Sequence, residues 1–422
     1  MKHGMKSVED VLKMNFESIP ENSFWNTDKN KELKMHRIHA YPAKFPAFIT
    51  TKVLEYFWKK NKPRALADIF CGCGTVAFEA KRNGIDFWGC DINPVATMIA
   101  KVKSQTYNSE KLKLYLEIIL NNFLKTKPEK YDSANERLKY WYSPKQFENL
   151  SRLKTAIDLS VSDTSNYHLF FICAFSNILK PTSRWLTKSI KPQKDPKKKR
   201  ANVISVFRRQ CKFMIDANQE INLNNGSKTT IVNENILNLG KDAPKVDMII
   251  TSPPYVTSYE YADLHQLSSL WLGYTRDYRE LRSGSIGSRH HIFSFEKEVK
   301  RLNKTGSDIV FRLSNKDKSK AKAVAKYFLD MQSVAKECRS MLSKKGKALF
   351  VIGNTEFKGV RIENARHLSE ALIQGGFKKV MVTKRKIIGK TLTPYRDGIG
   401  KFTNDKNSRK IYSEEFILIG SK

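Results

Sequence analysis

The stretch ADIFCGCGTVAFEA, residues 67–80, decides the fold of this 422-residue chain. A short apolar run from Arg64 to Ile69 enters a glycine turn, and Thr75 to Asn83 has helical composition. A second apolar run covers Asp86 to Gly89. This order of strand, loop, helix and strand is half of a doubly wound α/β fold.

The glycine turn predicts a site for a nucleotide-like cofactor. Gly72 and Gly74 let the backbone turn sharply towards a ligand, to which the following helix presents its N-terminus. Asp91, at the end of the second strand, would accept hydrogen bonds from ribose hydroxyls. With Ala77, the same pattern fits the fingerprint of nicotinamide dehydrogenases, so this motif leaves that class open. Asp68 favours S-adenosylmethionine, because a carboxylate there would suit an ammonium group and oppose a pyrophosphate.

A second motif, TSPPY, occupies residues 251–255 directly after the strand-like VDMII. Its two prolines fix the backbone and expose carbonyl oxygens, while Ser252 offers a hydroxyl and Tyr255 a flat ring. These groups suit a planar exocyclic amine, whose hydrogens Ser252 and the carbonyl of Pro253 would attract. The exocyclic amine of a nucleic-acid base, such as N4 of cytosine, is out of reach inside a stacked duplex. A base that reacts at this site must therefore be flipped out. Tyr255 is the candidate ring that would stack on it.

Strand-like runs resume after a long interruption. They are Thr229–Val232, Val246–Ile250, Lys347–Ile352 and Glu415–Ile419. Residues 104–225 instead show helical apolar spacing, as in KLKLYLEIIL and FENLSRLKTAI, which predicts a helical insertion. We therefore expect residues 1–103 to form the N-terminal segment and the cofactor-binding half of one domain, 104–225 its insertion, and 226–422 its catalytic half.

The charge of the chain predicts a polyanionic partner. Lys and Arg number 76 against 42 Asp and Glu, which gives +34 at pH 7. Nucleic acid fits better than a membrane, because the charge is not gathered on an amphipathic helix or beside an apolar anchor. The longest apolar patch, Leu169 to Leu179, is too short to span a bilayer and predicts a core helix.

The polar N-terminal segment and the cysteines predict a cytoplasmic protein without a metal site. The first residues lack the continuous apolar stretch of a secretory signal. The six cysteines show no paired CxxC spacing, which argues against a disulfide framework and against zinc. Cys71 and Cys73 are close in sequence, but they lie in the glycine turn, where small side chains suit tight packing.

A strongly basic stretch, Lys180 to Lys212, carries twelve Lys or Arg and one acid, Asp195. Within it, KPQKDPKKKR contains two prolines and no apolar residue, which predicts a mobile loop that follows phosphates. Trp185 and Phe207 are interleaved with these cations, as in proteins that bind nucleic acid. Residues 273–322, with SGSIGSRHHIF, compete with the insertion as the recognition region. The candidate DNA-binding residues are Arg184, Lys197, Lys198, Lys199, Arg200, Arg208, Arg209 and Arg289.

DIFCGCGT and TSPPY resemble two motifs of the amino-group DNA methyltransferases, which methylate N4 of cytosine or N6 of adenine. The first is similar to their D-x-F-x-G-x-G-T cofactor motif. The second resembles the S-P-P-Y motif of the N4-cytosine branch, whereas the adenine branch usually has D-P-P-Y or N-P-P-Y. YEYADLHQLSSLWLG, KGKALFVIGNTEFKG and EEFILIG extend the similarity to most of the chain outside the insertion. The resemblance implies a Rossmann-like, seven-stranded S-adenosylmethionine-dependent methyltransferase fold with one antiparallel strand near its end.

The resemblance also implies roles for particular residues. HRIHAYPAKFPAFI, residues 36–49, is similar to an H-x-Y-P-A-K-F-P segment that borders the methionine end of the cofactor. TIVNENILNL, residues 230–239, resembles the strand and loop beside the adenine, with Asn233 or Asn235 where an acid is more usual. The expected cofactor-binding residues are Lys44, Phe45, Asp68, Phe70, Gly72, Gly74, Thr75, Asp91, Ile92 and Asn235. The expected catalytic residues are Ser252, Pro253, Pro254 and Tyr255.

The expected function is methyl transfer from S-adenosylmethionine to N4 of cytosine in double-stranded DNA. Such an enzyme would serve a restriction-modification or related system, with a separately encoded endonuclease as its partner. Transfer to N6 of adenine, transfer to an amino group of RNA, and a DNA-binding subunit without activity stay open as alternatives. A cytosine C5 methyltransferase is excluded, because it needs a cysteine nucleophile after proline and no Pro-Cys dipeptide occurs. The sequence leaves the target site and the oligomeric state open.

Overall fold

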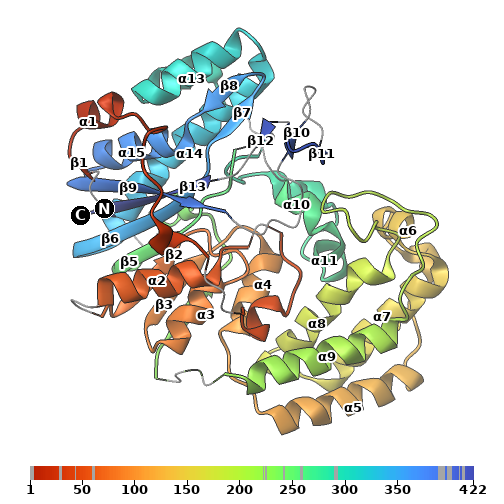
Figure 1. Cartoon of the computed structure of the whole chain (residues 1–422). Coiled ribbons are helices and arrows are strands. Elements are labelled where there is room, and N and C mark those ends of the chain that lie inside the picture. Colours follow the sequence, from red (N-terminus) through yellow and green to blue (C-terminus); the bar gives the residue numbers. More distant parts are fainter. Residues whose placement is uncertain are drawn as a thin grey trace.

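A computed structural model describes most of the chain (Figure 1). The described residues are 4–27, 31–42, 44–58, 62–221, 223, 226–240, 243–256, 260–288, 293–387, 395–396, 402–407, 409–410 and 414–422. In this part of the chain the main element is an eight-stranded sheet with the order β1-β9-β13-β6-β5-β2-β3-β4. The strands are β1 Gly4–Met5, β2 Ala65–Asp68, β3 Asp86–Cys90, β4 Thr229–Val232, β5 Val246–Thr251, β6 Leu342–Ile352, β9 Lys379–Lys386 and β13 Glu414–Ser421.

The sheet is parallel from β4 to β6 and becomes mixed at its other end. β13 lies antiparallel between β6 and β9, and β1 adds a short antiparallel strand at the edge, beside β9. Without β1, this is the seven-stranded sheet with one antiparallel strand near its end that the resemblance implied. The expected Rossmann-like α/β fold is therefore confirmed, and β1 is an addition that the sequence did not predict.

Helices cover both faces of the sheet (Figure 1). One layer contains α1 Val8–Lys13, α13 Lys304–Ser314, α14 Lys318–Met341 and α15 Asn364–Gln374, and the other contains α2 Ala47–Trp58, α3 Thr75–Arg82 and α4 Pro94–Lys103. The strands alternate between the layers: Ala67 and Ile249 face the first, whereas Leu66, Met248 and Ile250 face the second. This period of two explains why the central strands read as short, almost wholly apolar runs.

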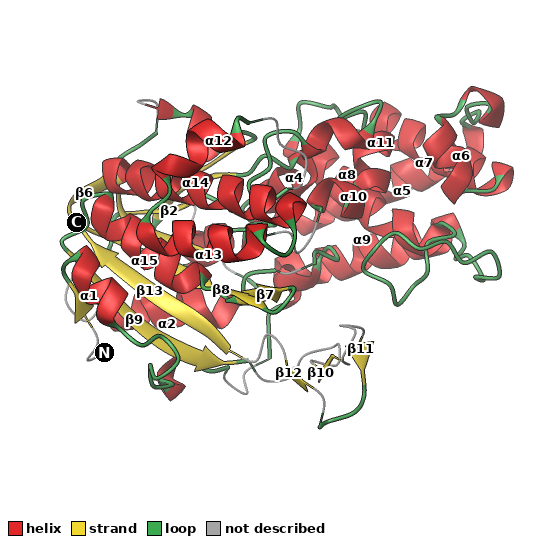
Figure 2. Cartoon of the chain, turned by 90° about the horizontal axis from the view of Figure 1, so that it is seen from above, coloured by secondary structure: helices red, strands yellow, loops and turns green. Residues whose placement is uncertain are grey.

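The chain between β3 and β4 contains a group of helices that lies beside the sheet, as Figure 2 shows from above. These helices are α5 Ser109–Lys125, α6 Glu136–Trp141, α7 Pro144–Ser160, α8 Asn166–Thr182 and α9 Val203–Gln219. Their apolar core continues into α4 through Ile99 and into α11, Gln266–Trp271, through Leu267 and Trp271. The helices are thus joined to the sheet by shared packing. The predicted core helix, Leu169 to Leu179, lies within α8.

Short elements complete the described chain. The helices are α10 Tyr261–Leu264 and α12 Phe295–Glu298, and the 3₁₀ helices are η1 Ser23–Trp25, η2 Lys34–Arg37, η3 Tyr131–Ser133, η4 Ile236–Asn238, η6 Tyr278–Arg282 and η7 Val299–Arg301. The short strands are β7 Thr355–Phe357, β8 Val360–Ile362, β10 Tyr395–Arg396, β11 Phe402–Thr403 and β12 Arg409–Lys410. None of the described helices has the length and apolar composition needed to cross a membrane.

Candidate active site

The two motifs singled out in the sequence meet at neighbouring strand ends. β2 leads into the glycine turn and β5 leads into TSPPY, and the two strands pair in parallel through Leu66–Met248 and Ala67–Ile249. Asp68 ends β2, and Thr251 ends β5. The Thr251 hydroxyl donates a hydrogen bond of 2.6 Å to Oδ1 of Asp68. The predicted cofactor loop and the predicted catalytic turn are therefore bonded directly to each other.

Two carboxyl groups without a cationic partner in the described part of the chain lie at this edge of the sheet. Burial raises the pKa of Asp68 to about 7, although hydrogen bonds from Thr251 and from the amide of Phe70 act in the opposite direction. Burial likewise raises the pKa of Asp91 to about 6. No Lys or Arg among the described residues forms an ion pair with either carboxylate. A positively charged ligand would relieve the cost of ionising them.

The glycine turn lies between α4 and Tyr41 and packs tightly on the side of α4. Gly72 and Gly74 have positive φ angles of 47° and 76°. A Cβ on Gly74 would lie 2.6 Å from Cα of Ala100, and a Cβ on Gly72 would lie 3.6 Å from the Tyr41 ring. The amide of Gly72 donates to Oδ2 of Asp91 at 2.9 Å, which fixes the turn against the end of β3. Both positions thus require glycine for conformation, and Gly74 also for space.

The loop continues into α3 with a buried hydroxyl. Thr75 begins this helix, and its Oγ1 has no hydrogen-bond partner among the described residues. Phe70, which precedes the turn, is half-buried and packs against the apolar core. Thr75 therefore offers a polar atom at the helix N-terminus, where ligand anions and polar groups commonly bind.

The segment SGSIGS, residues 283–288, connects the two ends of the site, and we call it the strap. The carbonyl of Gly284 accepts a hydrogen bond of 3.0 Å from Nδ2 of Asn235, and a Cβ on Gly284 would lie 3.2 Å from Ile92. At the other end, a Cβ on Gly287 would lie 3.5 Å from the carbonyl oxygen of Tyr255. The sequence suggested this region as a competitor for DNA recognition, but it did not reveal this position between Asn235 and Tyr255.

The expected adenine-side residues lie together. Ile92 and Asn235 both contact Gly284, and Nδ2 of Asn233 donates to the backbone oxygen of Asp91 at 2.8 Å. Asn233 thus joins β4 to the end of β3, while Asn235 reaches the strap. The two asparagines that the sequence left as alternatives have different positions.

The upstream segment brings Tyr41, which was not among the expected residues, close to the glycine turn. Nζ of Lys44 is bonded to Oε2 of Glu32 at 2.7 Å and to the carbonyl of His36 at 2.9 Å, and Phe45 packs against an apolar cluster that includes Cys71. Tyr41 is the residue beside the glycine turn. Its ring stacks on His265 with a centroid distance of 5.0 Å and on Tyr261 at 6.4 Å. The tyrosine of the H-x-Y-P-A-K-F-P pattern was the signal that could have identified it.

Ser252 is arranged to accept hydrogen bonds. Its hydroxyl donates to the carbonyl of Val351 in β6 at 3.0 Å, so its own hydrogen is occupied and its lone pairs face other partners. Ser252 and Pro254 are half-buried, and Pro253 is buried. The turn is therefore fixed against the neighbouring strand.

Tyr255 is held by two charged residues that the sequence did not identify. Its hydroxyl donates to Oε1 of Glu415 at 2.8 Å, and the other oxygen of Glu415 accepts a hydrogen bond of 2.9 Å from Nε of Arg385. Burial and the adjacent Glu415 raise the pKa of Tyr255 above its usual value, so the phenol stays neutral. A Cβ on Gly353 would lie 3.3 Å from the Tyr255 ring, so Gly353 leaves room for that ring.

KPQKDPKKKR, residues 191–200, is an irregular segment between α8 and α9, as expected, and Lys198 connects it to the helices. Nζ of Lys198 donates to the carbonyls of Lys180 and Trp185, at 2.8 and 2.7 Å. Trp185 is buried and stacks on Trp141 with a centroid distance of 5.1 Å. Phe207 is also buried, so neither aromatic ring is available to bases. The bonds of Lys198 and the stacked tryptophans hold this segment against the helices.

The other candidate DNA contacts differ in exposure. Lys197, Lys199, Arg200, Arg208 and Arg209 are exposed, and Arg184 is half-buried. Arg289 lies outside the described residues. All six cysteines are buried free thiols, and no group of three or more potential metal ligands gathers among the described residues.

No family model matches the chain. The chain is 25% identical over 427 residues to the Type II methyltransferase M.MvaI of Kocuria varians, which covers 94% of this chain and 92% of the relative. It is 22% identical over 399 residues to M.AvaI of Nostoc sp., another Type II methyltransferase, which covers 84% and 81%. A shorter match, 36% identical over 97 residues, is to the Type II methyltransferase M.MjaII of Methanocaldococcus jannaschii, over 22% of this chain and 18% of the relative.

Among solved structures, the rRNA methyltransferase aviRa from Streptomyces viridochromogenes aligns over 91% of this chain and 88% of its own, with 8% identity and a TM-score of 0.28. That score is too low to support a shared fold. The chain is thus similar over almost its full length to Type II methyltransferases.

Proposed function

We propose that the chain is a site-specific DNA methyltransferase of the restriction-modification type. The observation that carries this proposal is the hydrogen bond between Asp68 and Thr251, because it joins the glycine-turn site to the Ser-Pro-Pro-Tyr turn. The similarity to Type II methyltransferases along almost the whole chain supports it. A net charge of +34 suits double-stranded DNA as the substrate. A separately encoded endonuclease would complete such a system.

The residues at the glycine turn fit S-adenosylmethionine. Asp68 would accept hydrogen bonds from its ammonium group, Asp91 would bind the ribose hydroxyls, and Ile92 with Asn235 would border the adenine. Two carboxyls with raised pKa values and the buried hydroxyl of Thr75 suit a cationic, polar ligand. Once bound, the cofactor would supply an electrophilic methyl group.

The chain's own residues would prepare the amine that receives this methyl group. We assign N4 of cytosine as that amine. The Ser252 hydroxyl donates its hydrogen to the carbonyl of Val351, so its lone pairs would accept a hydrogen bond from one N–H of the amine. The carbonyl of Pro253 would accept a hydrogen bond from the other N–H. These two hydrogen bonds would raise the electron density on the nitrogen, whose lone pair is otherwise delocalised into the ring. Tyr255, fixed by Glu415, would stack on the flipped base.

Product analysis tests this proposal. The purified protein is incubated with unmethylated plasmid DNA and S-adenosylmethionine, and the nucleosides released by digestion are identified by mass spectrometry. N4-methylcytosine at a recurring sequence is the expected product. N6-methyladenine would overturn the assignment of the base, and transfer to RNA but not to DNA would overturn the assignment of the polymer. DNA binding without any methyl transfer would overturn the proposed enzyme.

A further inference from the structure

Cationic and aromatic side chains alternate where the helical group meets the segment after α10. Nζ of Lys194 lies 4.2 Å from the ring centroid of Tyr140, and Cζ of Arg137 lies 4.9 Å from the same centroid. Arg137 and Arg282 lie 5.4 and 5.6 Å from the ring centroid of Tyr278. We call these five residues the cation-aromatic ladder. It joins three segments: the basic stretch, α6 and η6.

Arg137, in the middle of the ladder, is held in one orientation. Its Nε donates to Oε1 of Gln266 at 2.6 Å, and the indole N–H of Trp141 donates to the same oxygen at 2.9 Å. Cζ of Arg137 also lies 5.3 Å from the Trp141 ring. Since Gln266 is fully buried, this amide is a fixed anchor. The two Nη atoms make no hydrogen bond or ion pair among the described residues, so the donor fork of the guanidinium is free.

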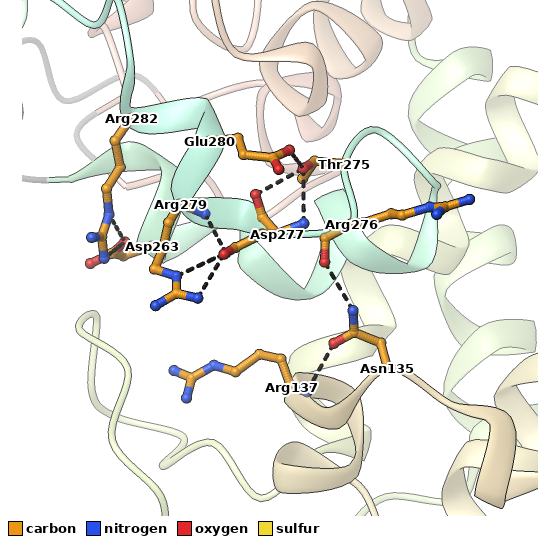
Figure 3. Close-up of polar contacts among 9 residues, drawn as sticks. All are labelled: Asn135, Arg137, Asp263, Thr275, Arg276, Asp277, Arg279, Glu280 and Arg282. Carbon is orange, nitrogen blue, oxygen red and sulfur yellow. Dashed lines mark hydrogen bonds and ion pairs between the residues drawn. The ribbon is translucent and has the colours of Figure 1, made fainter.

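Figure 3 draws Arg137 with the polar residues of the segment around η6. The amide of Arg137 donates to Oδ1 of Asn135, and Nδ2 of Asn135 donates to the carbonyl of Arg276 at 2.9 Å. The Arg137 side chain extends from α6 with its guanidinium clear of the other labelled side chains, and Arg276 points away from the group. The Asn135 side chain thus connects α6 to the segment before η6 without a hydrogen bond to the guanidinium group of Arg137 or Arg276.

The charges of this surface are only partly balanced. Nη2 of Arg282 is paired with Asp263 at 2.7 Å, and Nη2 of Arg279 with Asp277 at 2.7 Å. Arg137 and Lys194, which share the Tyr140 ring, have no carboxylate within ion-pair distance in the described part of the chain. Two cations held at one ring repel each other, and a polyanion would relieve this repulsion.

Two connections lead from the ladder to the candidate active site. Gln266, which anchors Arg137, follows His265, whose ring stacks on Tyr41 beside the glycine turn. Arg282 directly precedes the strap, which reaches Asn235 and Tyr255. Residues next to the ladder in the chain are thus in contact with both sides of the candidate active site.

We propose that the cation-aromatic ladder is a DNA contact, in which the free fork of Arg137 donates to a pair of acceptor atoms on the duplex. The acceptors are either phosphate oxygens or O6 and N7 of guanine, which guanidinium groups bind in the same bidentate manner. The inference rests on the proposed function, because it names residues that would hold the substrate of that site. A planar group already fixed by aromatic rings loses little freedom on binding.

Substitutions of Arg137 test the ladder. Arg137→Ala removes the fork, whereas Arg137→Lys keeps the charge and removes the paired donors. Arg152→Lys is the matched control, because Arg152 lies over Phe123 in the helical group, 5.4 Å from its centroid, and has no place in the ladder. Binding is measured by fluorescence anisotropy at several salt concentrations. The probes are one duplex carrying the site mapped on plasmid DNA and one of scrambled sequence.

The two acceptor types predict different results. A phosphate contact predicts that Arg137→Ala weakens binding to both duplexes and lowers the slope of log affinity against log salt by about 1. A guanine contact predicts a loss of about 5- to 150-fold on the mapped duplex with little change on the scrambled one. Replacing guanines of the site by 7-deazaguanine should then reproduce the loss with the unaltered protein. In either case Arg137→Lys should restore only part of the affinity.

Unchanged affinity, salt slope and site preference for both Arg137 variants would overturn the proposal, with Arg137 serving only to join the two parts of the chain. If Arg137→Ala fails to fold, Lys194→Met gives the second test, because Lys194 lies at the outer end of the ladder, over the Tyr140 ring. Cofactor binding and thermal unfolding serve as folding controls. If the unaltered protein methylates DNA and these variants bind DNA normally, only the proposed role of the ladder is rejected. If the unaltered protein transfers no methyl group, the proposed function itself is rejected.

Discussion

The hydrogen bond of the Ser252 hydroxyl determines whether this group can donate to or accept from a bound amine. The hydroxyl donates its only hydrogen to the carbonyl of Val351, which leaves it as an acceptor for an amine. Ser252→Ala removes this hydrogen-bond acceptor, and we expect the single-turnover methylation rate to fall by about 100-fold, as for the loss of one positioned hydrogen-bond partner in an active site.

The control for this variant is cofactor binding, which calorimetry should find unchanged because Ser252 belongs to the turn after β5. Transfer at the normal rate would remove Ser252 from the mechanism.

Under the proposed function, Asp68 would make the affinity for S-adenosylmethionine depend on pH. Burial raises its pKa to about 7, so the free protein holds a proton there below that pH. An ammonium group favours the carboxylate, so binding below pH 7 must release this proton, and the affinity should fall by up to about tenfold per pH unit. Asp91, with a pKa of about 6, would add a second decline below pH 6. Calorimetric titrations from acid to neutral pH measure this.

Asp68→Asn is the matched variant, since an amide keeps an acceptor for Thr251 and does not ionise in this range. It should bind S-adenosylmethionine more weakly and lose the decline that begins near pH 7. An affinity of the unaltered protein that is constant from pH 8 to pH 6 would contradict a contact between Asp68 and the ammonium group.

At the scale of elements, β9 and β13 fix the ring of Tyr255 through Arg385 and Glu415. Tyr255→Phe keeps the ring and leaves Glu415 paired with Arg385, so we expect the transfer rate to stay within about tenfold of normal. Tyr255→Ala removes the stacking surface, which is worth about 1–3 kcal/mol per base, and should lower the rate and the flipping of the base together. Fluorescence of 2-aminopurine at the target position reports the flipping. Equal losses for both variants would mean that the hydroxyl, and not the ring, matters.

The sequence predicted the central strands because each is a short apolar run buried on both faces. β9 was missed for an equally physical reason. Its residues Lys384 and Arg385 look like surface residues, yet both are buried, because they pair with Glu414 and Glu415 on β13. Partners some 30 residues apart become visible only when the antiparallel register of the two strands is known.

In the candidate active site, too, contacts between residues far apart in the sequence could not be predicted. Asp68, the glycines and Ser252 stand in local motifs, so they could be predicted from a few residues of sequence. Glu415, the strap and Tyr41 reach the site only through the arrangement of the sheet and its loops. The stacking of Trp185 on Trp141 likewise joins residues of two different segments, so the sequence alone did not show that Trp185 is buried.

At the scale of the whole molecule, we expect some of the excess cationic side chains to bind DNA and others to stabilise the fold. Lys197, Lys199 and Arg200 are exposed, so replacing all three by Ala should weaken DNA binding and lower the salt slope by about 1 for each phosphate that the protein no longer neutralises. Lys198 is bonded to two carbonyls, so Lys198→Met should instead lower the free energy of unfolding by about 1–2 kcal/mol.

Anisotropy across a salt series and denaturant unfolding separate the two effects. The assignment of these neighbouring lysines would be wrong if Lys198→Met changed the salt slope as much as the triple variant and left the unfolding free energy unaltered.

The hydrogen bond from Thr251 to Asp68 has a consequence for how two ligands would communicate. Ionisation of Asp68 strengthens the acceptor that holds Thr251, and Thr251 is the first residue of the turn that would receive the base. Occupancy at one strand end would therefore bias the other, and thermodynamic linkage requires the effect to be reciprocal. If the cofactor raises the affinity for the duplex by some factor, the duplex must raise the affinity for the cofactor by the same factor, without any movement of domains.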